Sequence, residues 1–298
     1  MEKSNHNDQT FNAVSNPEAK KPEAAKQSTS IPELTAVPNH ALQDREIFLH
    51  GGVTRESAHS VILQMRALAK QNKEPITFWI NSPGGTINDG LAIYDTMRDL
   101  ISQGITIKTV AYGIAASMGS FLLSAGSPGH RTMLPCAIEM THQPSGGYIG
   151  KEDGIRNCSK SMSETRDIME SHYAHFMGLD DEDEETRMLL KEYMSPDVYL
   201  NAYMAQRLGL IDNIAMQEQG KPQQGLKDEF LRKSIEIDIR LHKRQFDKID
   251  TSRGSTDPRR FVKNLIEHRD NYLAVQAAKV AAPPIANDVG AAAQPNQP

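Results

Sequence analysis

Hydrophobic and polar positions along residues 41 to about 214 follow two different periods in turn. Short apolar runs, rich in β-branched and aromatic residues, occur at 45–51, 76–82 and 106–113, and such runs are typical of buried strands. Between them, apolar residues recur with the period of an amphipathic helix. The order strand, helix, strand, helix predicts a mostly parallel sheet that is covered by helices.

Three helices follow from the same pattern. The first begins after Thr54, which is placed to cap it, the second covers 87–102, and a long one covers about 151–177. The first helix has an apolar face formed by Ala58, Val61, Ile62, Met65, Leu68 and Ala69. The second is expected to bury Leu91, Ile93, Met97, Leu100 and Ile101.

The two ends of the chain differ from this central domain, which we place at 41–214. Residues 1–40 are rich in polar residues and proline, which predicts a disordered N-terminal tail. Residues 215–298 form a C-terminal extension that we expect to be partly helical, with a helix that Asp257 caps and a disordered segment over 281–298. Within it, Ile235, Ile237, Ile239 and Leu241 stand at period two, which favours a strand over 234–242 despite charged helix formers around it.

Composition narrows the class of protein. The 298 residues carry a formal net charge of −5, which argues against a general nucleic-acid binder. No apolar run reaches the ~18 residues that a membrane span needs, and the N-terminus lacks the apolar core of a signal peptide. We therefore expect a soluble cytoplasmic protein without a membrane or nucleic-acid partner. Cys136 and Cys158 form no disulfide framework or metal spacing, and no cofactor is predicted.

Ser117 lies where the third apolar run ends and a helical pattern begins. Ala115 and Gly119 flank it two positions away on either side, in a relative of the turn that exposes a nucleophilic serine. A nucleophile also needs a base, a group that orients the base, and donors for the oxyanion. A serine that merely caps a buried helix explains this local pattern about as well, so the stretch by itself leaves both interpretations open.

Candidates for the other parts lie in two further segments. His142 stands at the end of an apolar run and before a Gln-Pro pair, where a strand edge can direct a base into a cleft. Gly84 and Gly85 follow a predicted strand, so their amides are candidate donors, and the absence of a complete phosphate-binding motif argues against a nucleotide site. His172 and His175 lack partners at ligand spacing, which favours packing or surface roles over a metal site.

Three segments together are far more specific than any one of them. Residues 78–97, 113–126 and 140–150 resemble the ClpP peptidase family in that family's order, and the 25-residue step from Ser117 to His142 also matches. The resemblance covers about 42–214. It implies an α/β fold of crotonase-like stacked βαβ units with a projecting handle helix, and a Ser-His-Asp peptidase assembled as two stacked heptameric rings around a chamber.

The position of the aspartate depends on the alignment. Matching 193–196 puts Lys191 at the aspartate position and predicts a broken triad. Matching 197–212 runs without gaps and puts Asp197 there, which we prefer. The second alignment leaves extra residues upstream, and we interpret 178–193 as an insertion in a solvated acidic loop.

By resemblance, each residue then has a role. Ser117 attacks the scissile carbonyl, His142 takes its proton, and Asp197 orients the imidazole. The backbone amides of Gly85 and Met118 form the oxyanion hole. The chain order Ser, His, Asp also differs from that of α/β-hydrolases.

Three departures from the family pattern concern assembly. The segment that lines the family's axial pore is not recognisable, so docking of a Clp-type ATPase ring is in doubt. Pro196 and Val198 stand where the family usually has arginines that join the two rings, so ring pairing is expected to use the strand at 146–148 and the handle helix. The extension from about 215 has no counterpart in the family core.

The leading interpretation is therefore an ATP-dependent-type serine endopeptidase that cleaves unfolded polypeptides or short peptides in protein quality control. The alternative is a catalytically inactive ClpP-like structural or regulatory subunit, which the Lys191 alignment would favour. A crotonase-like acyl-CoA enzyme lacks an evident CoA site here. A signal-peptide-peptidase relative with a Ser-Lys dyad would leave His142 unexplained.

Overall fold

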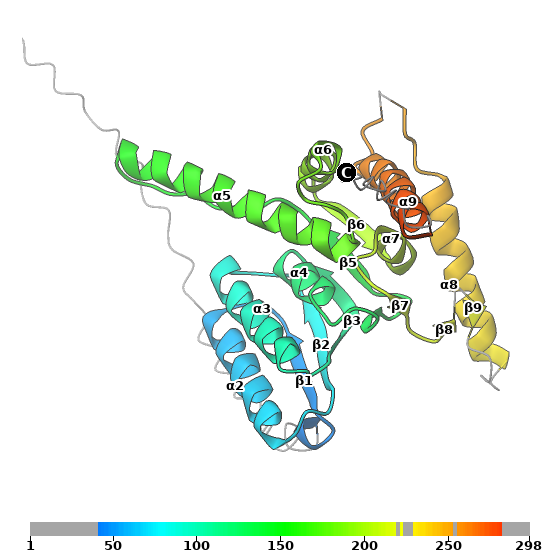
Figure 1. The fold of residues 1–298 in the computed structure, drawn as a ribbon, viewed down its shortest axis with the longest axis horizontal. Coiled ribbons are helices and arrows are strands. Elements are labelled where there is room, and N and C mark those ends of the chain that lie inside the picture. The colour runs from blue at the N-terminus through cyan, green and yellow to red at the C-terminus, as the bar shows by residue number, and fades with distance from the viewer. Residues whose placement is uncertain (1–40, 219–220, 223–228, 253–254, 282–298) are drawn as a thin grey trace, which may run out of the picture.

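A seven-stranded sheet organises the central domain of the protein (Figure 1). The computed structural model describes residues 41–218, 221–222, 229–252 and 255–281. The prediction of a disordered tail over 1–40 lies outside these residues, and so does that of a disordered end over 281–298, apart from Ala281, which ends a helix.

The sheet is almost entirely parallel, as the strand and helix order predicts. Strands β1 (Glu46–His50), β2 (Ile76–Ser82), β3 (Ile107–Ala116), β4 (Arg131–Met133) and β7 (Asn213–Ile214) pair in that order, all parallel. On the edge of β3 that faces away from β2, two strands follow each other. Thr109–Ala111 pair with β4, and Ile114–Ala116 pair with β5 (Ile138–Thr141). Strand β6 (Val198–Asn201) adds to β5 as the antiparallel member.

Helices α2 (Arg55–Gln71) and α3 (Ile87–Ser102) lie side by side over the first strands (Figure 1). Thr54 caps α2 as predicted, since its side chain accepts from the amide of Ser57 and the Ser57 hydroxyl in turn accepts from the Thr54 amide. The short α4 (Met118–Ser124) is buried along its whole length. These elements form the predicted βαβ units, and α4 is part of the hydrophobic core between them.

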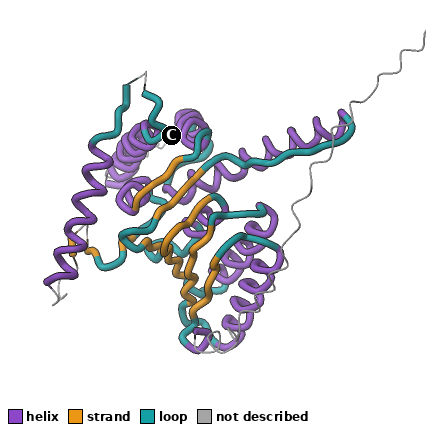
Figure 2. Tube along the Cα trace, turned by 180° about the vertical axis from the view of Figure 1, so that it is seen from behind, coloured by secondary structure: helices purple, strands orange, loops and turns teal. Residues whose placement is uncertain are grey.

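Helix α5 (Glu152–Met177) is the projecting handle. It extends away from the rest of the molecule, and the segment that precedes it runs alongside it (Figures 1 and 2). Only its last turns are buried in the core, through Met169, Tyr173, Ala174 and Met177. Residues 146–148, predicted as a strand, belong to no strand within this chain.

The acidic segment is not the solvated loop that we predict for 178–193. Residues from 184 onward form α6 (Glu184–Met194), and Asp183 caps it by accepting from the amide of Thr186 at 2.7 Å. The acids of its first turn lie where the helix dipole favours negative charge, while Leu190 and Tyr193 are buried. In this segment the acidic residues therefore cap and begin a helix.

The strand predicted over 234–242 is also wrong, because this segment lies in α8 (Glu229–Asp247). Ile235 is 2% exposed, whereas Ile237 and Leu241 are 40% and 44% exposed. The inward positions follow the helical period of three to four residues. The period-two isoleucines therefore divide between two faces of a helix, which the charged helix formers around them favour.

The rest of the extension packs on the central domain. Two short strands, β8 (Gln217–Glu218) and β9 (Lys221–Pro222), pair with each other. Helix α9 (Arg260–Ala281) packs on α6 and on α7 (Ala202–Leu208), and it buries Val262, Leu265 and Ile266. Asp257 accepts from the amide of Arg259, so the predicted capping turn is present and the helix begins three residues after Asp257. None of the described helices combines the length and apolarity that crossing a bilayer requires.

Candidate active site

Ser117 sits in the turn between β3 and α4 with a φ of 54° and a ψ of −121°. A positive φ is uncommon for a residue with a side chain and marks a strained turn. The hydroxyl makes no capping hydrogen bond to α4, and its Oγ lies 2.9 Å from Nε2 of His142 instead. The geometry thus differs from that of a serine that simply caps a helix.

The glycines around this turn make room for the serine. A Cβ on Gly84 would lie 2.6 Å from the Cβ of Ser117, and a Cβ on Gly119 would lie 2.9 Å from the carbonyl oxygen of Ser82. Neither contact is tolerable, so the β2–α3 loop and the start of α4 approach closely only because both positions lack side chains.

Two strand registers bring the candidate residues together. The parallel pairing of Ala116 with Met140 places Ser117, one residue on, beside the end of β5. The antiparallel pairing of Thr141 with Val198 places the next residues, His142 and Asp197, opposite each other. Residues that lie 25 and 55 positions apart in the chain therefore meet at one edge of the sheet.

His142 lies between the serine and the aspartate. Its Nδ1 is 3.2 Å from Oδ1 of Asp197, and its Nε2 faces Ser117. Because an ionised carboxylate can only accept, Nδ1 carries the proton in this arrangement and Nε2 is free to accept from the serine hydroxyl. The Asp197 side chain is 61% exposed, so water competes for it.

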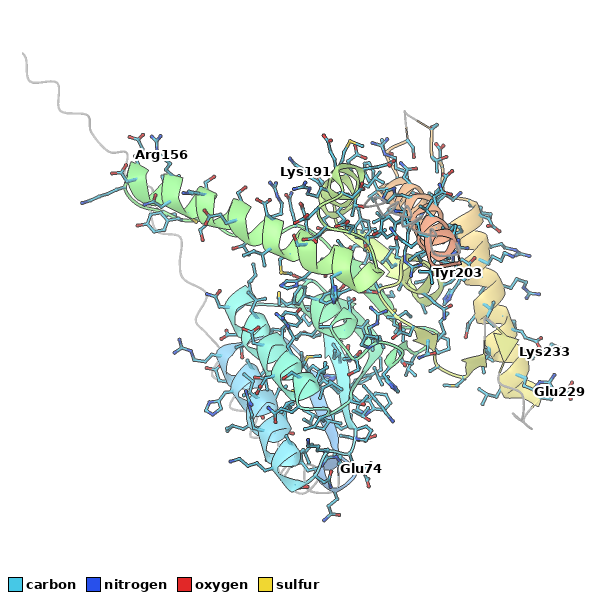
Figure 3. All side chains as sticks on the ribbon, viewed as in Figure 1. Glu74, Arg156, Lys191, Tyr203, Glu229 and Lys233 are labelled. Carbon is cyan, nitrogen blue, oxygen red and sulfur yellow. The ribbon has the colours of Figure 1, made fainter. Side chains whose placement is uncertain are left out.

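Lys191 is not at this position. It lies on the exposed side of α6, where it acts electrostatically on Glu170 of the handle helix (Figure 3). The structure thus brings Asp197 to His142, as the gapless alignment predicts, and leaves Lys191 on another surface.

The two predicted oxyanion donors border the same space. Gly85, Ser117, Met118 and His142 line one pocket of about 40 Å³. Gly85 has a φ of +153° and forms a parallel bridge with Val53, and a Cβ on it would lie 2.2 Å from the Val53 oxygen. Only glycine therefore fits this position, and its backbone reaches the rim of the pocket.

Residues that sequence reasoning missed lie directly behind this pocket. Tyr173 of α5 lines the pocket and donates to Oγ of Ser120, which in turn donates to Oε1 of Glu139 at 2.6 Å. Glu139 is fully buried, and this burial raises its pKa to about 7. A charged residue inside the apolar run at 137–141 is the signal in the sequence that could have revealed it.

Of the two histidines on the handle helix, His172 packs against aromatic rings and His175 is exposed. The ring of His172 lies among Tyr94, Phe121 and Phe176, and its Nδ1 is 3.3 Å from the Tyr94 hydroxyl. Burial lowers its pKa. The described residues contain no group of three or more His, Cys, Asp or Glu side chains that could hold a metal ion, and both cysteines are free.

Comparison with protein families agrees with this arrangement. The family model described as Clp protease matches residues 30–218, which is more than half of the chain. The match includes every strand from β1 to β7, the handle helix and the site just described. The chain belongs to the Clp protease family.

Proposed function

We propose that this protein is a serine endopeptidase in which Ser117, His142 and Asp197 form a catalytic triad. The observation that carries the proposal is the continuous hydrogen-bonded series from Asp197 through both nitrogens of His142 to Oγ of Ser117. This series supports the proposal, because acyl transfer uses a nucleophile, a base and an orienting carboxylate in this order.

The reaction follows from these positions. Oγ of Ser117 attacks the carbonyl of the peptide bond while Nε2 of His142 takes its proton, and Asp197 stabilises the resulting imidazolium. The amides of Gly85 and Met118 donate to the oxyanion, where loss of one donor typically costs ~3 kcal/mol of the barrier. His142 then protonates the leaving amine, and water releases the acyl group by the same route.

The substrates we propose are unfolded polypeptides and short peptides that enter a chamber formed by two stacked heptameric rings. Exposed apolar side chains on the handle and the segment beside it support an assembly, since a monomer seldom exposes such a surface. These residues are Tyr148, Ile149, Ile155 and Ile168. Without an ATPase ring, only chains that are already unfolded are expected to reach the sites.

Hydrolysis of a casein-like unfolded protein and of a fluorogenic peptide tests this proposal. We expect wild type to cleave both and Ser117→Ala to cleave neither, with the two proteins equal in mass by analytical ultracentrifugation. An assembled wild type that cleaves neither substrate would contradict the peptidase proposal.

The second candidate is a catalytically inactive structural or regulatory subunit. The high exposure of Asp197 and the small volume of the pocket favour it, because both weaken the case for a fully formed site in this chain alone. The same assay separates the two functions. An inactive subunit would hydrolyse neither substrate, both as a single chain and in its assembled form.

A further inference from the structure

Glu139 is a carboxylic acid in the centre of the core, and the proposed mechanism gives it no role. It lies on β5 with none of its surface exposed. Its Oε1 accepts from Ser120 at 2.6 Å and from Ser124 at 3.4 Å, while its Oε2 has no hydrogen-bond partner among the described residues. Burying a carboxyl group costs free energy unless both of its oxygens are hydrogen-bonded. Since Oε2 lacks such a bond, part of this cost is not offset.

The contacts of Glu139 join the segments that carry the site. Ser120 and Ser124 lie one and two turns after Ser117 along α4, on the same face of that helix. Glu139 itself stands three residues before His142 on β5. The carboxyl group therefore ties the helix of the nucleophile to the strand of the base.

A second connection leads to the substrate pocket. The Tyr173 hydroxyl donates to Ser120 at 3.2 Å, and the Tyr173 side chain also lines the pocket that contains Ser117 and His142. Tyr173, Ser120 and Glu139 thus form one buried chain of hydrogen bonds that ends beneath the reacting groups.

We propose that Glu139 is a positioning residue whose ionised form holds α4 against β5 and so sets the approach of Ser117 to His142. The inference rests on the proposed peptidase function. It adds a second group, besides the histidine, whose protonation controls the rate.

The charges around Glu139 fit this role. Arg131 of β4 acts on it electrostatically, but the guanidinium is engaged by Asp212 at 2.6 Å. Within the part of the chain that the structure describes, the other titratable groups that act on it are Tyr173 of α5 and Tyr193 of α6, both fully buried. Among the described residues no cation forms an ion pair with it, so burial dominates and raises the pKa of Glu139 to about 7, near physiological pH.

Protonation changes the hydrogen bonds that Glu139 makes. The ionised carboxylate accepts strongly from both serines, whereas the acid is a weaker acceptor and adds an O–H donor. If that donor turns to Ser120, the hydrogen bond between the two side chains reverses, and the Ser120 hydroxyl loses the carboxylate as its acceptor. The link between α4 and β5 is then weakened, and a small displacement of a reacting group lowers a rate strongly.

The test is the rate of labelling of Ser117 by a fluorophosphonate between pH 5 and pH 9, in the full-length assembled protein. We compare wild type with Glu139→Gln, which mimics the neutral acid, and with Ser120→Ala, which removes the main donor to the carboxylate. Glu170→Gln is the matched control, because burial also raises the pKa of Glu170 but its side chain contacts neither α4 nor β5 in any described interaction.

We expect the wild-type rate to fall from pH 8 to pH 6 more steeply than one proton allows. Glu139→Gln should show a one-proton slope and a plateau lowered by about tenfold. Ser120→Ala should shift the steep region to higher pH, and it decides the question if Glu139→Gln fails to fold. Glu170→Gln should follow wild type.

Two results would overturn the inference in different ways. Wild type that labels with the same slope and plateau as Glu139→Gln, or a profile of Ser120→Ala that does not shift, removes the role of Glu139 and leaves the peptidase function intact. Wild type that labels at no pH overturns the peptidase function and the inference with it.

Discussion

The backbone amide of Ser117 donates a hydrogen bond to the carbonyl of Met140 at 2.8 Å. This bond continues the ladder between β3 and β5. It places Ser117 beside Met140, which precedes the base His142 by two residues. The backbone ladder of the sheet therefore fixes the position of the proposed nucleophile.

Replacement of Asp197 by asparagine should lower the labelling and peptidase rates by ~10²–10⁴, because an amide cannot hold the histidine tautomer in which Nε2 accepts from the serine. Stopped-flow or burst kinetics on a peptide ester would measure the loss. Lys191→Ala is the control and should leave the rate unchanged. A rate for Asp197→Asn within about twofold of wild type would reject Asp197 as the orienting group.

A methyl group at Gly85 should abolish activity. The added Cβ would meet the Val53 oxygen at 2.2 Å, and the φ of +153° is unfavourable for alanine. We expect Gly85→Ala to lose at least ~10² in kcat and about 1–3 kcal/mol of stability. Gly52→Ala, where the nearest atom would be 3.7 Å away, should behave as wild type in both assays. Equal activities for the two variants would argue against a donor at Gly85.

The central domain could be predicted from its sequence because each element carries a complete local signal. In each of these elements the apolar residues follow a single period, and residues typical of a terminus stand at its ends. The elements are the strands at 46–50 and 76–82, α2 with its Thr54 cap, and α3 over 87–102. The handle helix was equally clear in length, with Gly178 in the left-handed conformation at its C-terminus.

The errors occur where local signals conflict. In α8, alternating isoleucines favour a strand while the residues between them favour a helix, and packing on α7 settles the choice. In α6, the run of acids favours a solvated loop, although Asp183 caps a helix there. In both segments the deciding contacts come from α7 and α9, which no local pattern reveals.

Two isoleucines of α8 test that correction directly. Ile235→Ala should destabilise the protein by about 2–4 kcal/mol, because its side chain is buried, whereas Ile237→Ala should change stability by less than ~0.5 kcal/mol. Chemical denaturation measures both. In a strand the two residues would share a face and cost alike, so equal losses would contradict the helix.

The stability of the protein should depend on pH through Glu139. Its pKa is about 7 in the folded protein and near 4.5 for a glutamate in water, as in the unfolded chain, so the folded state binds more protons between these values. Stability therefore falls as pH rises from about 4.5 to 7, by at most about 3 kcal/mol from this group. Thermal unfolding of Glu139→Gln should lack this part of the pH dependence. A wild-type curve that matches the variant would show that the carboxyl titrates normally.

The site residues were predictable to different degrees. Ser117 and His142 stand within distinctive segments, whereas Asp197 depended on a choice between two alignments that only the β5–β6 register resolves. The chain from Tyr173 through Ser120 to Glu139 could not be read from spacing, since its members lie on three separate elements. Long-range side-chain contacts of this kind require the structure.

The most direct measurement of the central claim is reaction of the assembled protein with a fluorophosphonate, followed by mass spectrometric mapping of the adduct. The account predicts a single adduct on Ser117 in wild type, none in Ser117→Ala, and strongly slowed labelling in His142→Ala. An assembled wild type that takes no label, or an adduct on any other serine, would contradict it.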